Sequence, residues 1–166
     1  MGADDAKDGG RDTPAGFAAW VEPELSKMSR LATRLAPNAD RDDVVQEALV
    51  RAWRKRDQYD ESRGTAATWL LAITADQARR ARRRWRPLAL IGDIKVPSRS
   101  LDDRVDVEAA VARLANRQRL AVDCFYFVGL SVAETAAVMR CSEGTVKSTL
   151  SDARKRLRRL LEVDGG

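Results

Sequence analysis

Apolar residues recur at spacings of three and four along two stretches of the chain, residues 15–86 and 106–162. This period is typical of helices that bury one face. In the first stretch it predicts one helix over residues 17–35, a second that begins with Asp40 as its cap, and a third over residues 65–85. Arginine replaces the apolar stripe in the later half of the third helix, so we expect that half to leave the core as a basic rod.

The second stretch predicts four shorter helices. Two are expected over residues 105–114 and 117–128, and Gly129 should end the latter in a left-handed conformation. Ser131 and Ser142 can then cap two further helices that lie close together in the chain. Few prolines and many helix-forming residues support an all-α fold. The apolar residues expected to pack between the last two helices are Val132, Ala136, Ala137, Met139, Val146, Leu150, Ala153 and Leu157.

The segment between the two stretches, residues 87–105, contains two prolines and lacks a helical period. We therefore predict two small helical domains joined by an extended linker, which can reach about 60 Å. That length is nearly two turns of duplex DNA at about 34 Å each. Residues 1–14 are acidic and almost without apolar side chains, so they are predicted to form a disordered tail, and residues 163–166 form a second tail.

Charge and composition favour a polyanionic partner. The net charge is +5, and arginines gather in RRARRRWR at residues 79–86 and in RKRLRR at residues 154–159. Solvated helix faces are the alternative interpretation of both runs. We find no membrane-spanning run or signal-peptide core, so we expect a cytoplasmic protein that makes no membrane contact by itself.

Two cysteines, Cys124 and Cys141, stand in a chain that has no histidine. These are too few ligands for a structural zinc site, and no metal or other cofactor is expected. A disulfide is not expected in a reducing cytosol, and a redox role of either cysteine stays open.

The paired helices that start at Ser131 and Ser142 have the arrangement of a helix-turn-helix. A recognition helix needs small residues for close approach to base edges and donors for phosphates. The second helix offers such side chains and a free N-terminus for a phosphate. A helical hairpin that only packs, with a solvated outer face, is the alternative. The residues that suit DNA contact are Glu143, Gly144, Thr145, Lys147, Ser148 and Ser151.

Two features of the first stretch carry further chemistry. The polar loop over residues 57–64 holds Tyr59 and precedes Trp69 and the arginine run, and aromatic rings beside a basic track suit the stacking of unpaired bases. The alternative is that the tryptophans belong to the core. On the helix that begins at Asp40, a stripe of polar side chains faces outward, and neither a histidine nor a buried pocket is indicated that would tune it for acid–base chemistry. A docking surface for another protein and a solvated face are the interpretations left open for that stripe, which comprises Asp43, Glu47, Val50 and Arg54, with Gln46 beside it.

Taken together, these motifs resemble the bacterial sigma-70 family in its small two-domain form, the extracytoplasmic-function (ECF, group 4) sigma factors. Residues 42–47 and 51–53 are similar to region 2.2, which docks on the clamp helices of the polymerase β′ subunit. Residues 59–64 with Trp69 and Leu70 are similar to the loop and helix that melt the minus-10 element. Leu114, residues 117–119 and 129–131, and residues 142–148 are similar to region 4, which reads the minus-35 element.

The resemblance implies three sets of binding residues. Polymerase binding is implied for Asp43, Gln46, Glu47, Leu49 and Trp53. Minus-10 DNA binding is implied for Tyr59, Arg63, Gly64, Thr65, Trp69, Asp76, Arg79, Arg80 and Arg83. Minus-35 DNA binding is implied for Arg117, Ser142, Glu143, Gly144, Thr145, Lys147, Ser148, Ser151 and Arg154. The chain departs from the family's usual residues at Asp76, Asn116, Thr149 and Asp152, and an acid at position 152 would repel phosphate, so no promoter sequence is implied.

The predicted function is therefore that of a sigma factor, which is not an enzyme. It would bind core RNA polymerase through the β′ clamp helices and the β subunit, direct it to promoter DNA and help to melt the minus-10 element. An anti-sigma factor is a further partner that the resemblance implies. The alternative is a stand-alone helix-turn-helix regulator that binds operator DNA as a dimer. A small nucleic-acid enzyme would need metal ligands or a nucleophile–base pair, which the sequence does not offer.

Overall fold

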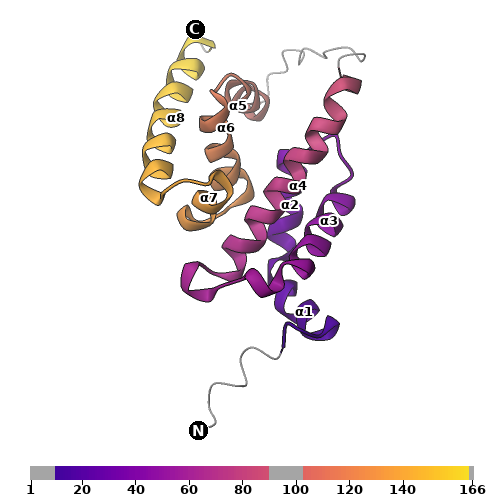
Figure 1. Cartoon of the computed structure of the whole chain (residues 1–166). Helices are drawn as coiled ribbons and strands as arrows, with labels where there is room; N and C mark the ends of the chain where they lie inside the picture. Colours follow the sequence, from indigo (N-terminus) through magenta and orange to yellow (C-terminus); the bar gives the residue numbers. More distant parts are fainter. Residues whose placement is uncertain (1–9, 90–102, 165–166) are drawn as a thin grey trace. The chain divides into compact units, whose positions relative to one another are not determined.

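The computed structural model describes residues 10–89 and 103–164 of the chain (Figure 1). All the regular secondary structure in those residues is helical, which confirms the all-α prediction. The chain divides into two compact units, one ending at Trp85 and one beginning at Arg86, which we call the first and second domains. Most of the predicted linker and tails, namely residues 1–9, 90–102 and 165–166, lies outside the described residues.

The first domain begins with two helices where the sequence predicted one. Pro23 has no N–H for a helical hydrogen bond, and its ring clashes with the carbonyl four residues earlier, so the α-helix ends at Val21 and restarts at Leu25. The prediction of one continuous helix over residues 17–35 was therefore wrong. The elements of this domain are α1 (Pro14–Val21), the 3-10 turn η1 (Glu22–Glu24), α2 (Leu25–Leu35), α3 (Arg41–Arg54), the 3-10 turns η2 (Arg56–Gln58) and η3 (Glu61–Arg63), and α4 (Ala66–Ala89).

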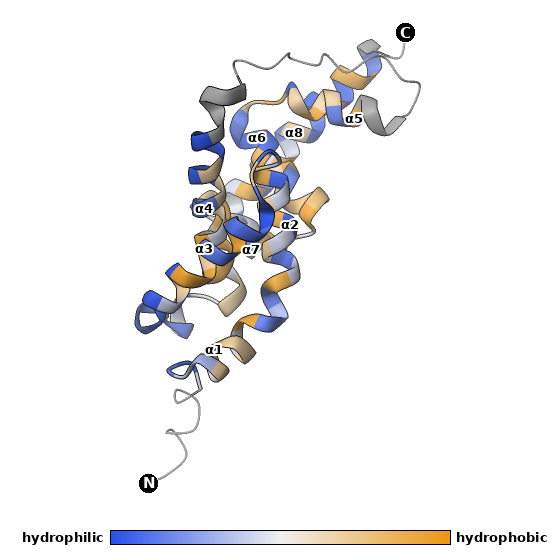
Figure 2. Cartoon of the chain, turned by 90° about the vertical axis from the view of Figure 1, so that its right-hand side faces the viewer, coloured by the Kyte–Doolittle hydropathy of each residue, from blue (hydrophilic) through white to orange (hydrophobic). Residues whose placement is uncertain are grey.

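Helix α4 extends four residues beyond the predicted end at Trp85 and includes Pro87. A proline removes one backbone hydrogen bond but does not by itself prevent the next turn from forming. The half of α4 that carries the arginines is coloured hydrophilic in Figure 2, whereas its first half contributes fully buried side chains such as Leu70, Leu71 and Thr74. The Thr74 hydroxyl donates to the Leu70 carbonyl over 2.8 Å, so its burial leaves no unsatisfied donor.

Removing a core side chain of the first domain should have a measurable cost. Leu71 is 0% exposed, and Leu71→Ala is expected to lower the free energy of unfolding of this domain by about 2–5 kcal/mol, because it leaves a cavity. Urea unfolding followed by tryptophan fluorescence reports this domain, since all four tryptophans stand at or before residue 85. The exposed Val50 supplies the control, and Val50→Ala should change stability by no more than about 0.5 kcal/mol. Equal losses in the two variants would contradict the packing described here.

Over residues 103–164, the second domain forms four α-helices and one π-helical segment. They are α5 (Asp103–Ala112), α6 (Asn116–Val122), the π-helical segment η4 (Asp123–Val128), α7 (Val132–Met139) and α8 (Glu143–Asp164). The predicted α-helix over residues 117–128 therefore changes to π geometry for its last six residues. This wider turn buries Cys124 and Val128 and leaves Tyr126 and Phe127 51% and 40% exposed. Gly129 ends the segment with φ = 80°, the left-handed conformation that the sequence predicted.

Helices α7 and α8 form the predicted helix-turn-helix hairpin. Ser131 and Glu134 form a capping box, in which the Glu134 amide donates to the Ser131 hydroxyl and Glu134 accepts from the Ser131 amide. Arg140 ends α7 with φ = 54°, also left-handed. The core beneath the hairpin comprises Val111, Leu114, Ala121, Val122, Ala136, Met139, Val146, Leu150 and Ala153, with Val132 and Leu157 packed against it. Ala137, which the sequence placed in this core, is only half-buried, and the neighbouring Val138 is fully buried.

Candidate protein-binding and nucleic-acid interfaces

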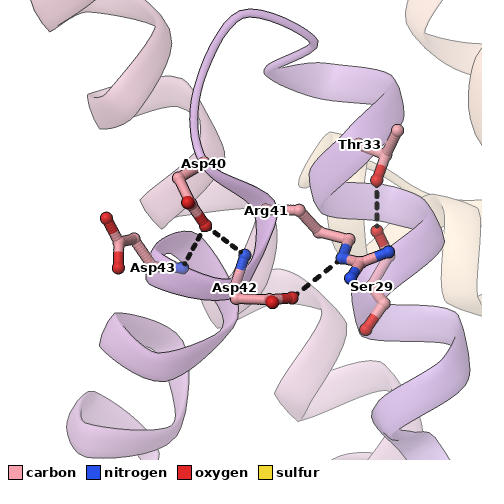
Figure 3. A network of polar contacts seen from close by, with 6 residues as sticks. All are labelled: Ser29, Thr33, Asp40, Arg41, Asp42 and Asp43. Atoms are coloured by element: carbon pink, nitrogen blue, oxygen red, sulfur yellow. Dashed lines mark hydrogen bonds and ion pairs between the residues drawn. The ribbon is translucent and has the colours of Figure 1, made fainter.

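The start of α3 is fixed by side chains that bind its own backbone. Asp40 accepts hydrogen bonds from the amides of Asp42 and Asp43, at 2.8 and 3.1 Å (Figure 3). The Arg41 guanidinium is hydrogen-bonded to the Asp42 carboxylate over 2.9 Å, and this contact raises the pKa of Arg41. The carboxylate of Asp43 points away from this network (Figure 3). The cap thus orders the first turn and leaves Asp43 directed outward.

The outward face of α3 carries a row that we call the α3 ridge, made of Asp43, Gln46, Glu47, Val50 and Arg54, all of which are exposed. The opposite face packs into the core through Val44, Val45, Ala48 and Ala52. Exposed carboxylates at one end and a 41% exposed valine in the middle give the ridge both polar and apolar contact area. This composition suits docking to a basic or mixed surface of another protein better than it suits catalysis.

Leu49 and Trp53, which the sequence also assigned to polymerase binding, are only half exposed. The Trp53 ring lies edge-on to Phe17, at 5.2 Å between centroids, and the Arg56 guanidinium lies 4.0 Å from its centroid. Much of the Trp53 surface is therefore occupied by neighbours in its own domain.

Three aromatic side chains from separate segments meet at one side of the first domain. We call Trp20, Tyr59 and Trp69 the aromatic cluster, and their ring centroids are 5.2 to 5.9 Å apart in tilted arrangements. All three side chains are half-buried, so they contribute to packing and keep part of their surface exposed. The two interpretations of the tryptophans that the sequence left open therefore do not exclude each other.

The loop that carries Tyr59 is held by its own hydrogen bonds. Asp60 accepts from the amide and the hydroxyl of Ser62, at 2.9 and 2.7 Å, and these bonds lower the pKa of Asp60. The Tyr59 hydroxyl donates to the Gly64 carbonyl over 3.2 Å. Burial raises the pKa of Tyr59, and the nearby Glu61 carboxylate adds to the rise, so the phenol keeps this donor proton at neutral pH. A Cβ at Gly64 would lie 2.8 Å from the Thr68 hydroxyl, which explains glycine at this close approach.

The remaining residues assigned to minus-10 DNA lie in this loop or on α4. Arg63 and Thr65 are exposed, and the Thr65 hydroxyl caps α4 by accepting from the Thr68 amide over 3.2 Å. Asp76 and Arg79 are half-buried and form an ion pair at 3.0 Å, so Arg79 does not offer its full charge to a ligand. Arg80 and Arg83 are exposed, together with Arg82 and Arg84. Helix α4 thus carries Trp69 of the aromatic cluster near its start and the exposed arginines further along.

The start of α8 presents small and basic side chains to solvent. The Ser142 hydroxyl accepts from the Thr145 amide over 3.1 Å, as its predicted capping role requires. Glu143, Gly144, Thr145, Lys147 and Ser148 are exposed, as is Arg117 on α6, while Ser151 is half-buried. The Arg154 guanidinium donates to the Tyr126 hydroxyl over 3.1 Å. Sequence reasoning missed Tyr126, because 28 positions separate the pair and no local pattern links them.

The comparisons with known proteins define the class of the chain. Residues 20–86 match the family described as Sigma-70 region 2, and residues 104–157 match Sigma-70, region 4. The first match contains α3, the Tyr59 loop and most of α4, and the second contains α7 and most of α8. The dimeric-regulator alternative does not account for this pair of regions.

Similar proteins with known names show which group of the sigma-70 family the chain belongs to. The chain is 35% identical over 147 residues to the ECF RNA polymerase sigma factor SigM of Mycobacterium tuberculosis, covering 83% of this chain and 71% of that protein. It is 34% identical over 157 residues to the RNA polymerase sigma-E factor of Streptomyces avermitilis, covering 88% and 85%. The chain therefore belongs to the ECF sigma factors of the sigma-70 family. It directs RNA polymerase to promoters, binds DNA through the region 4 helix-turn-helix and is not an enzyme.

Two solved structures share the architecture. One is CnrH in complex with the cytosolic domain of CnrY, with a TM-score of 0.59, 27% identity and coverage of 89% of this chain and 86% of that chain. The other is the sigma factor RpoE in complex with the anti-sigma factor NepR from Bartonella quintana, with a TM-score of 0.60, 28% identity and coverage of 89% and 98%. Within residues 10–89 and 103–164, no helix combines the length and apolar character needed to cross a membrane.

Proposed function

We propose that the α3 ridge is the surface through which this sigma factor binds core RNA polymerase, at the β′ clamp helices, with further contacts to the β subunit. The single observation that carries the proposal is the exposure of Asp43, Gln46 and Glu47 together on a helix whose opposite face is buried. The Asp40 cap orders the first turn of α3 before the partner binds, so less conformational entropy is lost on binding. The protein is proposed to act in the cytoplasm, because its proposed partners, core polymerase and promoter DNA, are there.

The aromatic cluster, the loop and the exposed arginines of α4 are proposed to hold the melted minus-10 strand. Extruding a base costs a few kcal/mol, and stacking on an aromatic ring returns about 1–3 kcal/mol per base. The half-exposed rings of Tyr59 and Trp69 supply such a surface, and Arg80 and Arg83 lie further along the same helix for backbone phosphates. At about 1.5 Å per residue, Trp69 and Arg80 are separated by about 16 Å along α4, which corresponds to a few nucleotides.

The N-terminal turns of α8 are proposed to read the minus-35 element. Gly144 and Ser148 allow a close approach to base edges, Lys147 supplies a charge for a phosphate, and Thr145 offers a hydroxyl. Arg154 is held by Tyr126 and so has a fixed position for a backbone contact. Asp152 is exposed next to the core residue Ala153, and its acid group disfavours phosphate on its own side of α8.

One charge on α8 tests the minus-35 proposal. Lys147→Gln is expected to weaken promoter binding and to reduce the slope of log K against log salt by about 0.9, which is the contribution of one phosphate contact on B-DNA. Arg158→Gln is the matched control, because it removes an exposed cation about 16 Å further along the same helix and should leave the slope unchanged. The measurement is anisotropy of labelled duplex promoter with holoenzyme at several salt concentrations. Equal slopes for Lys147→Gln and the wild type would contradict a phosphate contact.

An anti-sigma factor is the further proposed partner. The two structural neighbours described above were both solved with proteins bound, and one of these is named as an anti-sigma factor. Such a partner would inhibit by covering the α3 ridge or the DNA-binding face of α8. Purification of the tagged chain from its native cells, with identification of bound proteins by mass spectrometry, tests this proposal, and recovery of polymerase subunits alone would oppose it.

The proposed function is tested as a whole by transcription with purified components. Core polymerase is incubated with genomic DNA fragments, with or without the chain, and the 5′ ends of the transcripts are sequenced. We expect a small set of new start sites that share upstream elements only when the chain is present. The same start sites with and without the chain would contradict the proposal.

A further inference from the structure

The four residues ahead of α1 fold onto the loop proposed to bind the melted strand. Residues 10–13, which we call the N-terminal turn, were expected in the disordered tail, but the structure describes them as a turn. The Thr13 hydroxyl caps α1 by accepting from the Gly16 amide over 3.1 Å. The Gly10 carbonyl lies so close to Gly16 that any Cβ at position 16 would collide with it. The N-terminal turn is therefore packed against α1.

Arg11 in this turn contacts the aromatic cluster. Its guanidinium carbon lies 4.9 Å from the centroid of the Tyr59 ring and 5.5 Å from that of Trp20. Both distances are within the range of cation–π attraction. Arg11 also acts on the Tyr59 phenol, because its positive charge opposes the rise in the pKa of Tyr59 that burial and Glu61 cause. One side chain from the N-terminal turn thus joins α1 to the loop.

Asp12 makes a second connection to the same loop. Its carboxylate lies 3.6 Å from Nε of Arg56 in η2. Arg56 in turn lies over the Trp53 ring and donates from Nη1 to the Trp53 carbonyl over 2.9 Å. The Asp12 side chain is 67% exposed and that of Arg56 is 25% exposed, so solvent screens this ion pair and its contribution is expected to be small. Asp12 thus contacts η2, where the loop begins, and Arg11 contacts Tyr59 within the loop.

We propose that the N-terminal turn is a positioning element of the minus-10 site, in which Arg11 and Asp12 hold the Tyr59 loop in the conformation that receives an unpaired base. The inference rests on the proposed function of the aromatic cluster and extends it to residues that lie before the first helix. Arg11 acts through Tyr59 rather than by touching the DNA, because its guanidinium is directed at the two rings. A loop that is ordered before binding loses less conformational entropy when the strand arrives.

The test compares Arg11→Gln and Asp12→Asn with the wild-type full chain in two measurements. The first is amide hydrogen exchange of residues 57–64 in the free chain. The second is anisotropy of a fluorescein-labelled pool of single-stranded DNA 20-mers of random sequence, titrated with holoenzyme or with core polymerase alone at several salt concentrations. Arg30→Gln is the matched control, because Arg30 is an exposed cation on α2 of the same domain. Arg11→Lys keeps the charge without the planar group.

We expect Arg11→Gln to speed exchange in residues 57–64 and to weaken strand binding about two- to fivefold, the range given by the loss of one partly exposed cation–π contact. Asp12→Asn should act in the same direction with a smaller effect, Arg11→Lys should fall between wild type and Arg11→Gln, and Arg30→Gln should match the wild type in exchange. The salt slope of strand binding should not change in Arg11→Gln.

Three results would overturn the proposal. Unchanged exchange and binding in Arg11→Gln would show that the loop does not need the N-terminal turn. A salt slope lower by about 0.7 would show that Arg11 contacts a phosphate directly. Tighter strand binding in Arg11→Gln would show that the side chain obstructs the site. If wild-type holoenzyme binds the pool no better than core polymerase, the proposed function of the aromatic cluster fails as well, and that outcome is distinct from a defect confined to the variants.

Discussion

Core RNA polymerase is expected to lose about 100-fold in affinity for the chain when Asp43→Asn, Gln46→Ala and Glu47→Gln are combined. Hydrogen bonds that involve a charged group each contribute about 1.5–3 kcal/mol, and two such bonds account for a loss of this size at about 1.4 kcal/mol per factor of ten. The three side chains are exposed and lie opposite the buried face of α3, so the fold should be unaffected. Stimulation of transcription at concentrations that saturate the wild type should be abolished.

A control with the same loss of charge separates docking from net electrostatics. Glu22→Gln with Glu162→Gln also removes two exposed carboxylates, but neither residue lies on the α3 ridge. This pair should bind core polymerase with wild-type affinity, which surface plasmon resonance can measure. An equal loss of affinity for core polymerase in the two combinations would show that only overall charge matters. The α3 ridge would then not be the docking surface.

The second large effect is expected on α4. Replacing Arg79, Arg80 and Arg83 with glutamine removes two or three phosphate contacts, so the salt slope of single-strand binding should fall by about 1.4 to 2, at about 0.7 for each contact. Open-complex formation, followed by permanganate reactivity of unpaired thymines, should be lost at physiological salt. Arg79 is expected to contribute least, because it is paired with Asp76 at 3.0 Å.

Single substitutions measure the contribution of each arginine to the salt slope. Arg80→Gln should reduce the slope by about 0.7, whereas Arg30→Gln on α2 should leave it unchanged. Duplex binding by the second domain should be the same in all these variants. An unchanged slope in the triple variant would mean that the arginine run is only a solvated helix face, the alternative that the sequence left open.

Much of the fold follows from local signals in the sequence. The caps at Asp40, Ser131 and Ser142 and the left-handed Gly129 each depend on residues within a few positions, and each is present as predicted. The apolar period likewise placed the core of the helix-turn-helix hairpin correctly, apart from Ala137, which is only half-buried. Such features are local because a cap or a helical stripe is defined by the chain's own next turn.

The errors arose where two local rules competed or where geometry departs from the α-helix. The apolar stripe continues from residue 17 to residue 35 on both sides of Pro23. Its period therefore predicts one helix, although the α-helix is interrupted at residues 22–24. The segment over residues 123–128 has π-helical geometry where the apolar period predicts an α-helix, and no pattern in a single sequence indicates such a change.

The sites combine what sequence can predict with what it cannot. The exposure of the α3 ridge follows from helical periodicity, because its members alternate with the buried stripe. The meeting of Arg11 with Tyr59 and Trp20, and that of Arg154 with Tyr126, join residues distant in the chain. Those contacts depend on tertiary packing, so only the structure reveals them.

Photo-crosslinking can detect the proposed contact between the α3 ridge and the β′ subunit. A benzophenone amino acid is placed at Val50, an exposed member of the ridge that makes no polar contact the docking would need, and in a second variant at Arg30 on α2. After irradiation with core polymerase, docking through the ridge should give a β′ adduct from position 50 and none from position 30. Adducts to β′ from position 30 alone, or from neither position, would contradict it.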